Sequence, residues 1–349
     1  MRDVQVAIIG YGLSGRFFHA PLIAATEGLE VARVVTSSPV RRRQVASEHP
    51  RAEVVTGVEE LWSKPAPELV VVASPNDSHA AIASVAIERG IPVVVDKPLA
   101  ITAAQAEAVM VLAQRAAVLL TVFHNRRWDS DQLTLRRLIA EGALGEIVRY
   151  ESRFERWRPE LDRTKWRENV TPEQGGGILL DLGSHLVDQA MTLFGPVTHV
   201  YAEVDSRREA AADDDVFIAL RHARGTVSHL HASAVTPSIG PRLRVQGTTA
   251  GFLVSSLDPQ EAALRAGARP DRVANWGKPD EYEGGRLVAG EHSVPVPAEP
   301  GDWPRFYSLL REALANGGPP PVDPRDAVET LRVLEAARLA ARDRSIVSL

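Results

Sequence analysis

The chain has 349 residues, of which 44% are hydrophobic and 24% charged, and its formal net charge is −5. This length favours two domains, and the negative charge excludes the broad positive field of a nucleic-acid-binding protein. No apolar run reaches the roughly 20 residues that span a bilayer, and we expect no signal peptide. The absence of cysteine excludes disulfides, thiolate catalysis and cysteine-ligated metals. We therefore expect a cytoplasmic protein with no membrane and no nucleic-acid partner.

The first third of the chain alternates short apolar runs with helix-like stretches. The runs are rich in Val, Ile and Leu, which is typical of parallel strands buried on both faces. Their alternation with helices predicts a doubly wound α/β domain of the Rossmann type, which we place at residues 1–123. The predicted strands are Val4–Ile9, Leu29–Val35, Leu69–Ala73, Pro92–Val95 and Val118–Phe123, and the clearest helices are Ser78–Arg89 and Ala103–Arg115.

The remaining residues, 124–349, show a different pattern. Successive strand signals without crossover helices predict an α+β domain with a mostly antiparallel sheet. Residues 257–303 are rich in Gly, Pro and charge, and we interpret them as an irregular excursion of turns. A final helix is predicted at about 326–342. The other predicted elements are helices at Leu133–Glu141 and Leu180–Leu193 and strands at Glu146–Trp157, Val197–Val204, Val216–Arg221, Thr226–Ser233, Leu243–Gly247 and Phe252–Ser255.

A glycine motif directly follows the first predicted strand. Gly10, Gly12 and Gly15 have the G-x-G-x-x-G spacing, with Leu13 and Ser14 between the last two. In a dinucleotide fingerprint the first glycine permits a tight turn, the second lets the backbone approach the pyrophosphate, and the third lets helix and strand pack closely. A glycine-rich turn that binds nothing is the alternative. The position after the first strand of a parallel sheet favours the dinucleotide site.

The end of the second predicted strand bears on the choice between NAD and NADP. NAD sites usually carry Asp or Glu there to bind the ribose hydroxyls, whereas this chain has Thr36, Ser37 and Ser38. Arg41 and Arg42 follow one helical turn later and could pair with a 2′-phosphate through charge-assisted hydrogen bonds. These arginines could instead form a solvated helix face. The pattern favours NADP, with NAD as the less favoured cofactor.

Three further stretches stand where catalysis could occur. Residues 74–76 follow a predicted parallel strand, at the strand end that faces the cofactor crevice. Lys97 ends the next predicted strand, where burying a charged side chain costs free energy unless it has a partner or a function. Asp181 and His185 share one helical face, and such a pair can exchange protons near neutral pH. Each signal alone is weak, because a lysine before proline is often superficial and a helical Asp–His pair is often structural.

Together, the glycine motif, Lys97-Pro98 and Asp181-x-x-x-His185 resemble the glucose–fructose oxidoreductase/inositol dehydrogenase (Gfo/Idh/MocA) family over essentially the whole chain. The segments GYGLSGRFFHAPL, FHNRRWDSD, DLGSHLVDQ, DPQEAALRAG and ANWG are similar to its scyllo-inositol dehydrogenase branch, which uses NADP. Family motifs read Glu-Lys-Pro where this chain has Asp96-Lys97-Pro98. This conservative departure should leave the role of the lysine intact.

The resemblance implies hydride transfer between a nicotinamide cofactor and a secondary hydroxyl or ketone of a cyclic polyol or sugar, such as scyllo-inositol. It implies that Lys97 orients the reacting hydroxyl, His185 is the general base or acid, and Asp181 holds the substrate or the His–Lys array. The expected cofactor-binding residues are Gly10, Gly12, Leu13, Ser14, Gly15, Thr36, Ser37, Ser38, Arg41, Arg42, Ser74, Pro75, Asn76, His79 and Lys97. The expected substrate-binding residues are Lys97, His124, Asn125, Trp128, Trp166, Arg167, Asp181 and His185.

Other interpretations of these residues remain open. Asp181, His185 and Asp188 could hold a metal on one helical face, but zinc-dependent alcohol oxidation usually uses cysteine ligands, so we expect no metal. The basic and aromatic residues 126–128 could form a nucleic-acid patch, but a single such cluster on an acidic chain does not support one. Trp166 could stack on a polyol or could merely anchor its loop.

Two other functions compete with a polyol or sugar dehydrogenase. One is an imine or C=C reductase on the same fold, and the other is a non-catalytic sensor that binds NADPH. An antiparallel sheet needs one face covered by helices, and its other face could pack on a second copy. The resemblance likewise implies a homodimer or homotetramer formed through the C-terminal sheet.

Overall fold

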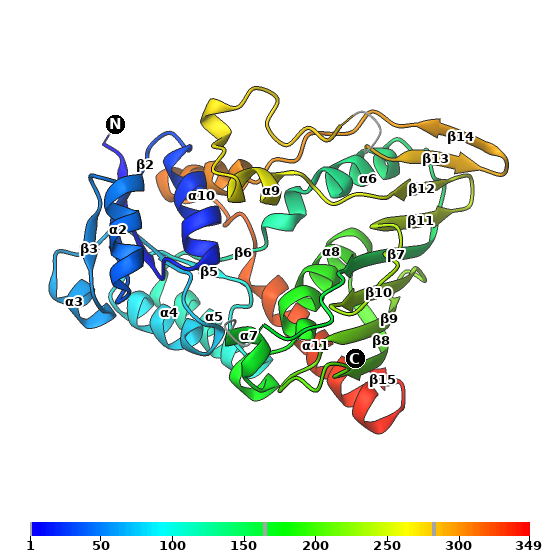
Figure 1. Cartoon of the computed structure of the whole chain (residues 1–349), viewed down its shortest axis with the longest axis horizontal. Coiled ribbons are helices and arrows are strands. Elements are labelled where there is room, and N and C mark those ends of the chain that lie inside the picture. Colours follow the sequence, from blue (N-terminus) through cyan, green and yellow to red (C-terminus); the bar gives the residue numbers. More distant parts are fainter. Residues whose placement is uncertain (1, 163–165, 281–283) are drawn as a thin grey trace.

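The computed structural model describes residues 2–162, 166–280 and 284–349, which form two parts that lie side by side (Figure 1). The N-terminal part contains a six-stranded parallel sheet with the order β3-β2-β1-β4-β5-β6. The strand order reverses between β1 and β4, and ligands of such sheets bind beyond the carboxyl ends of the strands at this point. The strands are β1 (Val4–Ile9), β2 (Leu29–Val35), β3 (Glu53–Val55), β4 (Leu69–Val72), β5 (Val93–Asp96) and β6 (Leu120–Phe123).

Helices link successive strands of this sheet, so the predicted doubly wound α/β fold is confirmed. Every residue of β4 and β5 is buried, which explains why their sequences show no polar alternation. Strand β3 and the two helices beside it were not predicted, because the strand is short and the helices are mostly polar. The helices are α1 (Ala20–Ala24), α2 (Pro39–Glu48), α3 (Val58–Ser63), α4 (His79–Glu88) and α5 (Ala103–Ala116).

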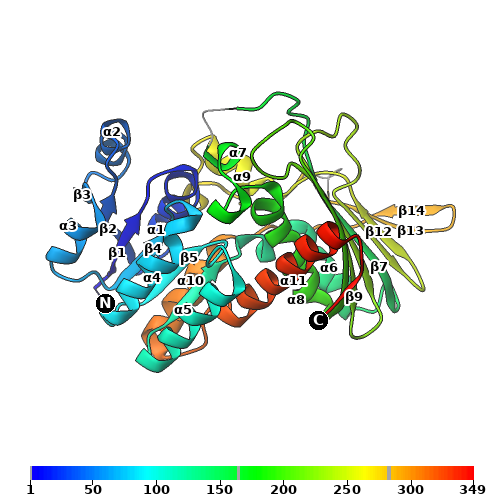
Figure 2. The same cartoon turned by 90° about the horizontal axis from the view of Figure 1, so that it is seen from below.

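The C-terminal part is built on a nine-stranded sheet with the order β14-β13-β12-β11-β7-β10-β9-β8-β15. Of its described strand pairs, only β7 with β10 is parallel, so the predicted mostly antiparallel sheet is confirmed. Helices α8 (Ser184–Phe194) and α11 (Pro324–Asp343) lie along one face of the sheet (Figure 2). The strands are β7 (Ile147–Glu155), β8 (Val197–Asp205), β9 (Asp215–His222), β10 (Val227–Ser233), β11 (Leu243–Gly247), β12 (Gly251–Val254), β13 (Arg286–Ala289), β14 (His292–Pro295) and β15 (Val347–Ser348).

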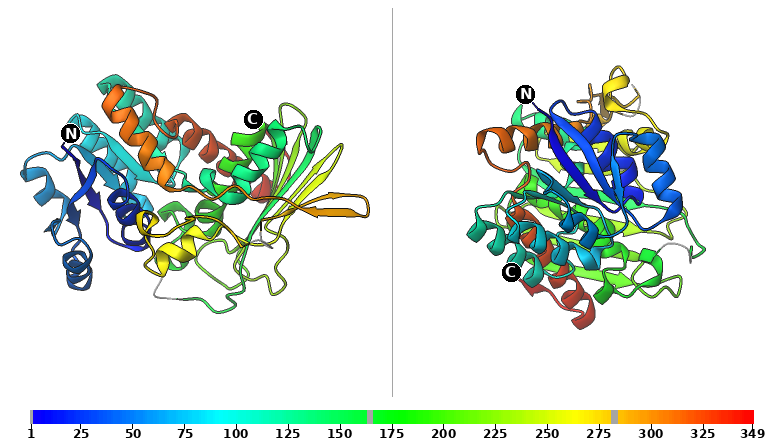
Figure 3. Two further views of the ribbon diagram at one scale, coloured as in Figure 1. Left: turned by 90° about the horizontal axis from the view of Figure 1, so that it is seen from above. Right: turned by 90° about the vertical axis from the view of Figure 1, so that its left-hand side faces the viewer.

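The prediction that residues 257–303 form only irregular turns is wrong. This segment contains helix α9 (Gln260–Arg265) and the hairpin β13–β14, which extends the sheet and projects from the molecule (Figures 1 and 3). Every residue of β14 is exposed. The hairpin therefore lacks the apolar alternation from which a strand is predicted.

Helix α10 (Pro304–Asn316) packs against the N-terminal part, although a boundary at residue 123 assigns it to the second domain (Figure 3). Trp303, Phe306 and Tyr307 are fully buried at its start, and the Phe306 ring meets Phe123 edge-on with centroids 4.9 Å apart. The Tyr307 hydroxyl lies 2.6 Å from Nδ1 of His19, which follows the glycine loop. The C-terminal segment thus helps to hold the loop region in place.

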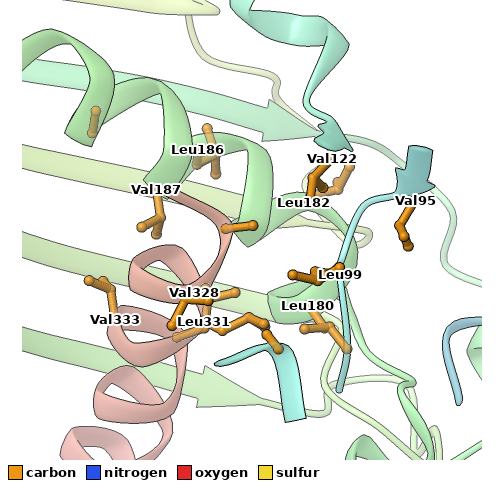
Figure 4. Packing of buried hydrophobic residues seen from close by; sticks show 14 of the residues in the cluster. Val95, Leu99, Val122, Leu180, Leu182, Leu186, Val187, Val328, Leu331 and Val333 are labelled. Atoms are coloured by element: carbon orange, nitrogen blue, oxygen red, sulfur yellow. The ribbon is translucent and has the colours of Figure 1, made fainter. Parts of the chain in front are cut away.

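One hydrophobic core joins the two parts where the candidate site lies. Val95 and Leu99, which flank the end of β5, belong to the same buried cluster as Leu180, Leu186 and Leu331 (Figure 4). The backbone after β5 is therefore packed directly on the start of α8 and on α11. No helix in the described part of the chain is long and apolar enough to cross a membrane.

Candidate active site

The glycine loop after β1 fits the phosphates of a dinucleotide. Gly10 has a φ of +99°, and a Cβ on Gly15 would lie 2.0 Å from the Gly10 carbonyl oxygen, so both positions require glycine. A Cβ on Gly12 would meet no protein atom closer than Nη2 of Arg41, at 4.0 Å. The packing of the protein does not require glycine at position 12. The open space beside Gly12 suits the close approach of a pyrophosphate.

The residues after β2 lie near the same loop. The Ser38 side chain accepts a hydrogen bond from the Arg41 backbone N–H and caps α2, so Arg41 projects from the first turn of that helix. Its guanidinium is thereby brought to the glycine loop. Thr36 is buried, and its backbone N–H donates to the carbonyl of Val55, the last residue of the neighbouring strand β3.

Asn76 and His79 lie on the segment after β4. The Asn76 Nδ2 donates to the Gly175 carbonyl at 2.9 Å, whereas its buried Oδ1 has no hydrogen-bond partner among the described residues. The two ring nitrogens of His79 lie 2.7 Å from the Pro98 carbonyl oxygen and 2.9 Å from that of Ser74. His79 therefore links the loops after β4 and β5, and its contact with a nicotinamide stays a prediction.

The remaining predicted cofactor residues lie on these same loops, except Arg42, which lies in helix α2. The buried Ser14 Oγ has no hydrogen-bond partner in the part of the chain that the structure describes. The Ser14 Oγ and the Asn76 Oδ1 are thus two buried polar atoms that the described residues leave available for hydrogen bonds to a ligand. With the open space beside Gly12, they make these loops fit a dinucleotide. The other residues in this group are Leu13, Ser37, Arg42 and Pro75.

Lys97 and Asp181 meet where the two parts join. Lys97 follows β5 directly, and its peptide bond to Pro98 is cis. Its side chain is 10% exposed, and Nζ donates to the Asp181 carboxylate at 2.7 Å and to the Asp181 carbonyl at 2.6 Å. The sequence predicted both residues for the site, and the structure brings them into contact. The lysine is thus partnered despite its burial.

Asp181 lies in a π-helical turn, η5 (Leu179–Gly183), that continues into α8. Such wider turns are rare and are often found at functional sites. Asp213, which the sequence analysis missed, holds the start of this turn: its carboxylate accepts the Leu179 N–H at 2.6 Å and its carbonyl accepts the Ile178 N–H at 2.9 Å. Asp213 is therefore a positioning residue for the segment that carries Asp181.

His185 lies in the first turn of α8 and is 6% exposed. Its Nδ1 is buried without a hydrogen-bond partner among the described residues, and its ring contacts Phe154 at a centroid distance of 6.3 Å. Burial lowers the pKa of the imidazole well below its usual value, and the positive charge of Lys97 lowers it further. His185 is therefore neutral near pH 7 and able to accept a proton.

His124 lies beside His185 and belongs to a buried ion-pair network. The two imidazole centroids are 6.4 Å apart, and His124 Nδ1 lies 3.7 Å from Asp188. Although burial opposes ionisation of Asp188, the Arg127 guanidinium beside it lowers the pKa of that carboxyl below its usual value. Asp188 is thus engaged by Arg127, which the sequence analysis did not place in this network. Among the described residues, no group of three or more His, Asp or Glu could hold a metal.

The other predicted substrate residues have different environments. Asn125 is buried in the turn η3 (Asn125–Trp128), and the Trp128 ring packs edge-on against Phe306, 6.0 Å between centroids. Trp128 therefore contributes to the core around α10, and its contact with a substrate stays a prediction. The side chains of Trp166 and Arg167 lie outside the described part of the chain, although helix α7 (Trp166–Asn169) is described.

Comparison with known proteins identifies relatives along the whole chain. Residues 4–124 match the family model described as "Oxidoreductase family, NAD-binding Rossmann fold", and residues 132–253 match the GFO/IDH/MocA C-terminal domain. The chain is 37% identical to the oxidoreductase YdgJ of Escherichia coli, with 99% of each chain covered. It is 35% identical to the scyllo-inositol 2-dehydrogenase (NADP(+)) IolW of Bacillus subtilis, covering 99% of this chain and 96% of that one. The solved oxidoreductase yvaA of B. subtilis superposes with a TM-score of 0.92 at 34% identity, covering 99% of both chains.

The space beside Gly12 predicts the effect of Gly12→Ala. The added methyl group meets no protein atom within about 4 Å, so we expect the Tm to fall by less than about 2 °C. It occupies the space proposed for the pyrophosphate, so we expect the Kd for NADPH to rise at least about tenfold by fluorescence titration. Gly318→Ala, at an exposed loop position where a Cβ would meet no atom closer than 3.9 Å, is the control and should leave both values unchanged. Wild-type affinity in Gly12→Ala would contradict the assignment.

The environment of His185 predicts how its titration responds to Lys97→Met. Removing the cation removes a charge that disfavours the imidazolium, so the pKa of His185 should rise. In the wild-type protein the ring should titrate well below 6.5, because burial lowers its pKa. NMR of the imidazole resonances measures both values, with Lys278→Met, at an exposed position, as the control. An unchanged or lower pKa in Lys97→Met would show that the two groups do not interact.

Proposed function

Because this chain belongs to the Gfo/Idh/MocA family of oxidoreductases, we propose that it transfers a hydride between NADP(H) and a secondary hydroxyl or ketone of a cyclic polyol or sugar. One observation carries this proposal. The Lys97 Nζ contacts Asp181 at 2.7 Å, and a neutral His185 stands within electrostatic range of the same ammonium group. A cation and a proton acceptor are the two groups that oxidation of an alcohol requires from the protein.

Each side chain has a distinct task in the proposed reaction. The Lys97 ammonium donates a hydrogen bond to the substrate oxygen and stabilises negative charge that develops there. The neutral imidazole of His185 accepts the hydroxyl proton, and in the reverse direction the imidazolium returns it to the ketone oxygen. Asp181 fixes the direction of the lysine through the contact at 2.7 Å. A nicotinamide bound on the loops after β1 and β4 would accept or supply the hydride.

The residues after β2 support NADP over NAD. No carboxylate follows this strand, and Arg41 approaches the glycine loop, where a guanidinium could bind a 2′-phosphate. The relative IolW carries NADP(+) in its name, which favours the same cofactor here. That name also favours scyllo-inositol as a first substrate to test.

The proposal is tested by steady-state assays with NADP and NAD over a panel of inositols and neutral sugars. We expect turnover with at least one member and a higher kcat/KM with NADP. General acid–base groups contribute about 10²–10⁴-fold, so Lys97→Ala and His185→Ala should each lower kcat at least about 100-fold. Lys278→Ala and His292→Ala, at exposed positions, are the matched controls.

Three outcomes would contradict this proposal. A fall in kcat of less than about tenfold in both Lys97→Ala and His185→Ala would contradict the roles assigned to these residues. NADPH binding without turnover on any substrate would favour a cofactor-binding sensor. Activity only with imines or C=C bonds would favour a different reductase on the same fold.

We also propose that two copies associate through the uncovered face of the nine-stranded sheet. Tyr201 and Phe217 lie in contact on this face, with ring centroids 6.5 Å apart, and Tyr201 is 36% exposed. Sedimentation velocity at micromolar concentration should show a dimer or tetramer, and Phe217→Arg should shift it toward monomer by placing charge at the centre of the contact. A monomeric wild-type protein would overturn this proposal.

A further inference from the structure

Arg156 stands beside the site without a role in the reaction described so far. It directly follows β7, and its backbone is fixed by a hydrogen bond from its N–H to the Ser233 carbonyl and one from the Thr236 N–H to its own carbonyl. Side chains alternate along a strand, so Arg156 shares a face with Phe154, two residues earlier. The Phe154 ring contacts His185, so this face of the strand is the one toward the candidate site.

The carboxylates near Arg156 already have closer cationic partners. Asp181 and Glu261 are the acidic groups that favour its charge, but Asp181 contacts Lys97 at 2.7 Å and Glu261 contacts Arg126 at 2.5 Å. No side-chain hydrogen bond or ion pair is formed by Arg156 within the described ranges. Burial lowers the pKa of this guanidinium, which shows that it lies partly out of water.

Three neighbouring arginines differ from Arg156 in this respect. Arg126 binds Asp129 and Glu261, Arg127 binds Asp188 and Asp326, and Arg242 lies 3.3 Å from Asp131. Each therefore has a carboxylate that compensates its charge. Arg156 is a half-buried cation whose five N–H donors have no acceptor among the side chains and carbonyls that the structure describes. An anionic ligand would supply the missing charge and hydrogen-bond acceptors.

We propose that the Arg156 guanidinium binds an anionic group of the substrate, so the preferred substrate is a polyol or sugar that carries a carboxylate or phosphate. This inference rests on the proposed function, because it places the anion on the molecule whose carbinol lies at Lys97. The planar guanidinium matches a carboxylate or phosphate through two parallel hydrogen bonds. Arg156 then determines specificity and takes no part in hydride or proton transfer.

The test compares matched neutral and anionic substrates with NADP: glucose with glucuronate and glucose 6-phosphate, and inositol with inositol monophosphate. For the wild-type protein we expect kcat/KM to be at least about tenfold higher with an anionic member than with its neutral counterpart. Arg156→Gln should abolish this preference, mainly by raising KM, and should change kcat/KM for neutral substrates less than about threefold. Arg156→Lys should retain part of it, because charge remains but the bidentate geometry is lost.

Arg224→Gln is the matched control, because Arg224 is an exposed arginine in the turn before β10, at the end of that strand opposite to Ser233, and should behave as wild type. Equal use of neutral and anionic substrates by the wild-type protein would overturn the inference, as would equal losses on both in Arg156→Gln. Calorimetric titration of each anionic compound into NADPH-loaded protein provides a readout that needs no turnover. If anion binding requires Arg156 but no compound is turned over, the proposed function alone is contradicted. If the wild-type protein shows neither anion binding nor a preference for anionic substrates, the inference is overturned.

Discussion

The structure of the site depends on the ion pair between Lys97 and Asp181, which are 84 residues apart in sequence. Lys97 directly follows strand β5 of the parallel sheet, and Asp181 lies in the π-helical turn before α8, so the pair forms only when the two parts of the chain are packed together. The shared core around Leu99 and Leu180 fixes that packing. The hydrogen bond from Asn76 Nδ2 to the Gly175 carbonyl provides a second polar connection between the two parts.

The ion pair also governs the electrostatics of the site. Burial lowers the pKa of His185, and the Lys97 ammonium group held close to it acts in the same direction, so the imidazole stays neutral. A neutral imidazole next to a fixed cation is the arrangement needed to accept a proton while negative charge develops on an oxygen. Asp181 compensates the lysine charge, which allows the lysine to remain in a largely dry position.

Much of this arrangement could be predicted from local sequence. The glycine spacing, the apolar runs of β4 and β5 and the Asp181–His185 spacing depend on short-range rules. The family resemblance implied only that Asp181 holds the substrate or the His–Lys array, and its direct contact with Lys97 is seen in the structure. Long-range packing could not be predicted. Tyr307 of α10 contacts His19, which lies 288 residues earlier in the chain, and the exposed hairpin β13–β14 has no apolar pattern. Whether an arginine has a carboxylate partner likewise depends on tertiary contacts, which is why the environment of Arg156 is visible only in the structure.

The most direct test of the central claim is a crystal structure with NADP and a polyol substrate or its ketone bound. We predict that the reacting oxygen lies within hydrogen-bond distance, about 2.6–3.2 Å, of both the Lys97 Nζ and a ring nitrogen of His185, with the nicotinamide C4 beside the same carbon. A substrate bound with its oxygen away from either of these side chains, in an otherwise productive complex, would contradict the account.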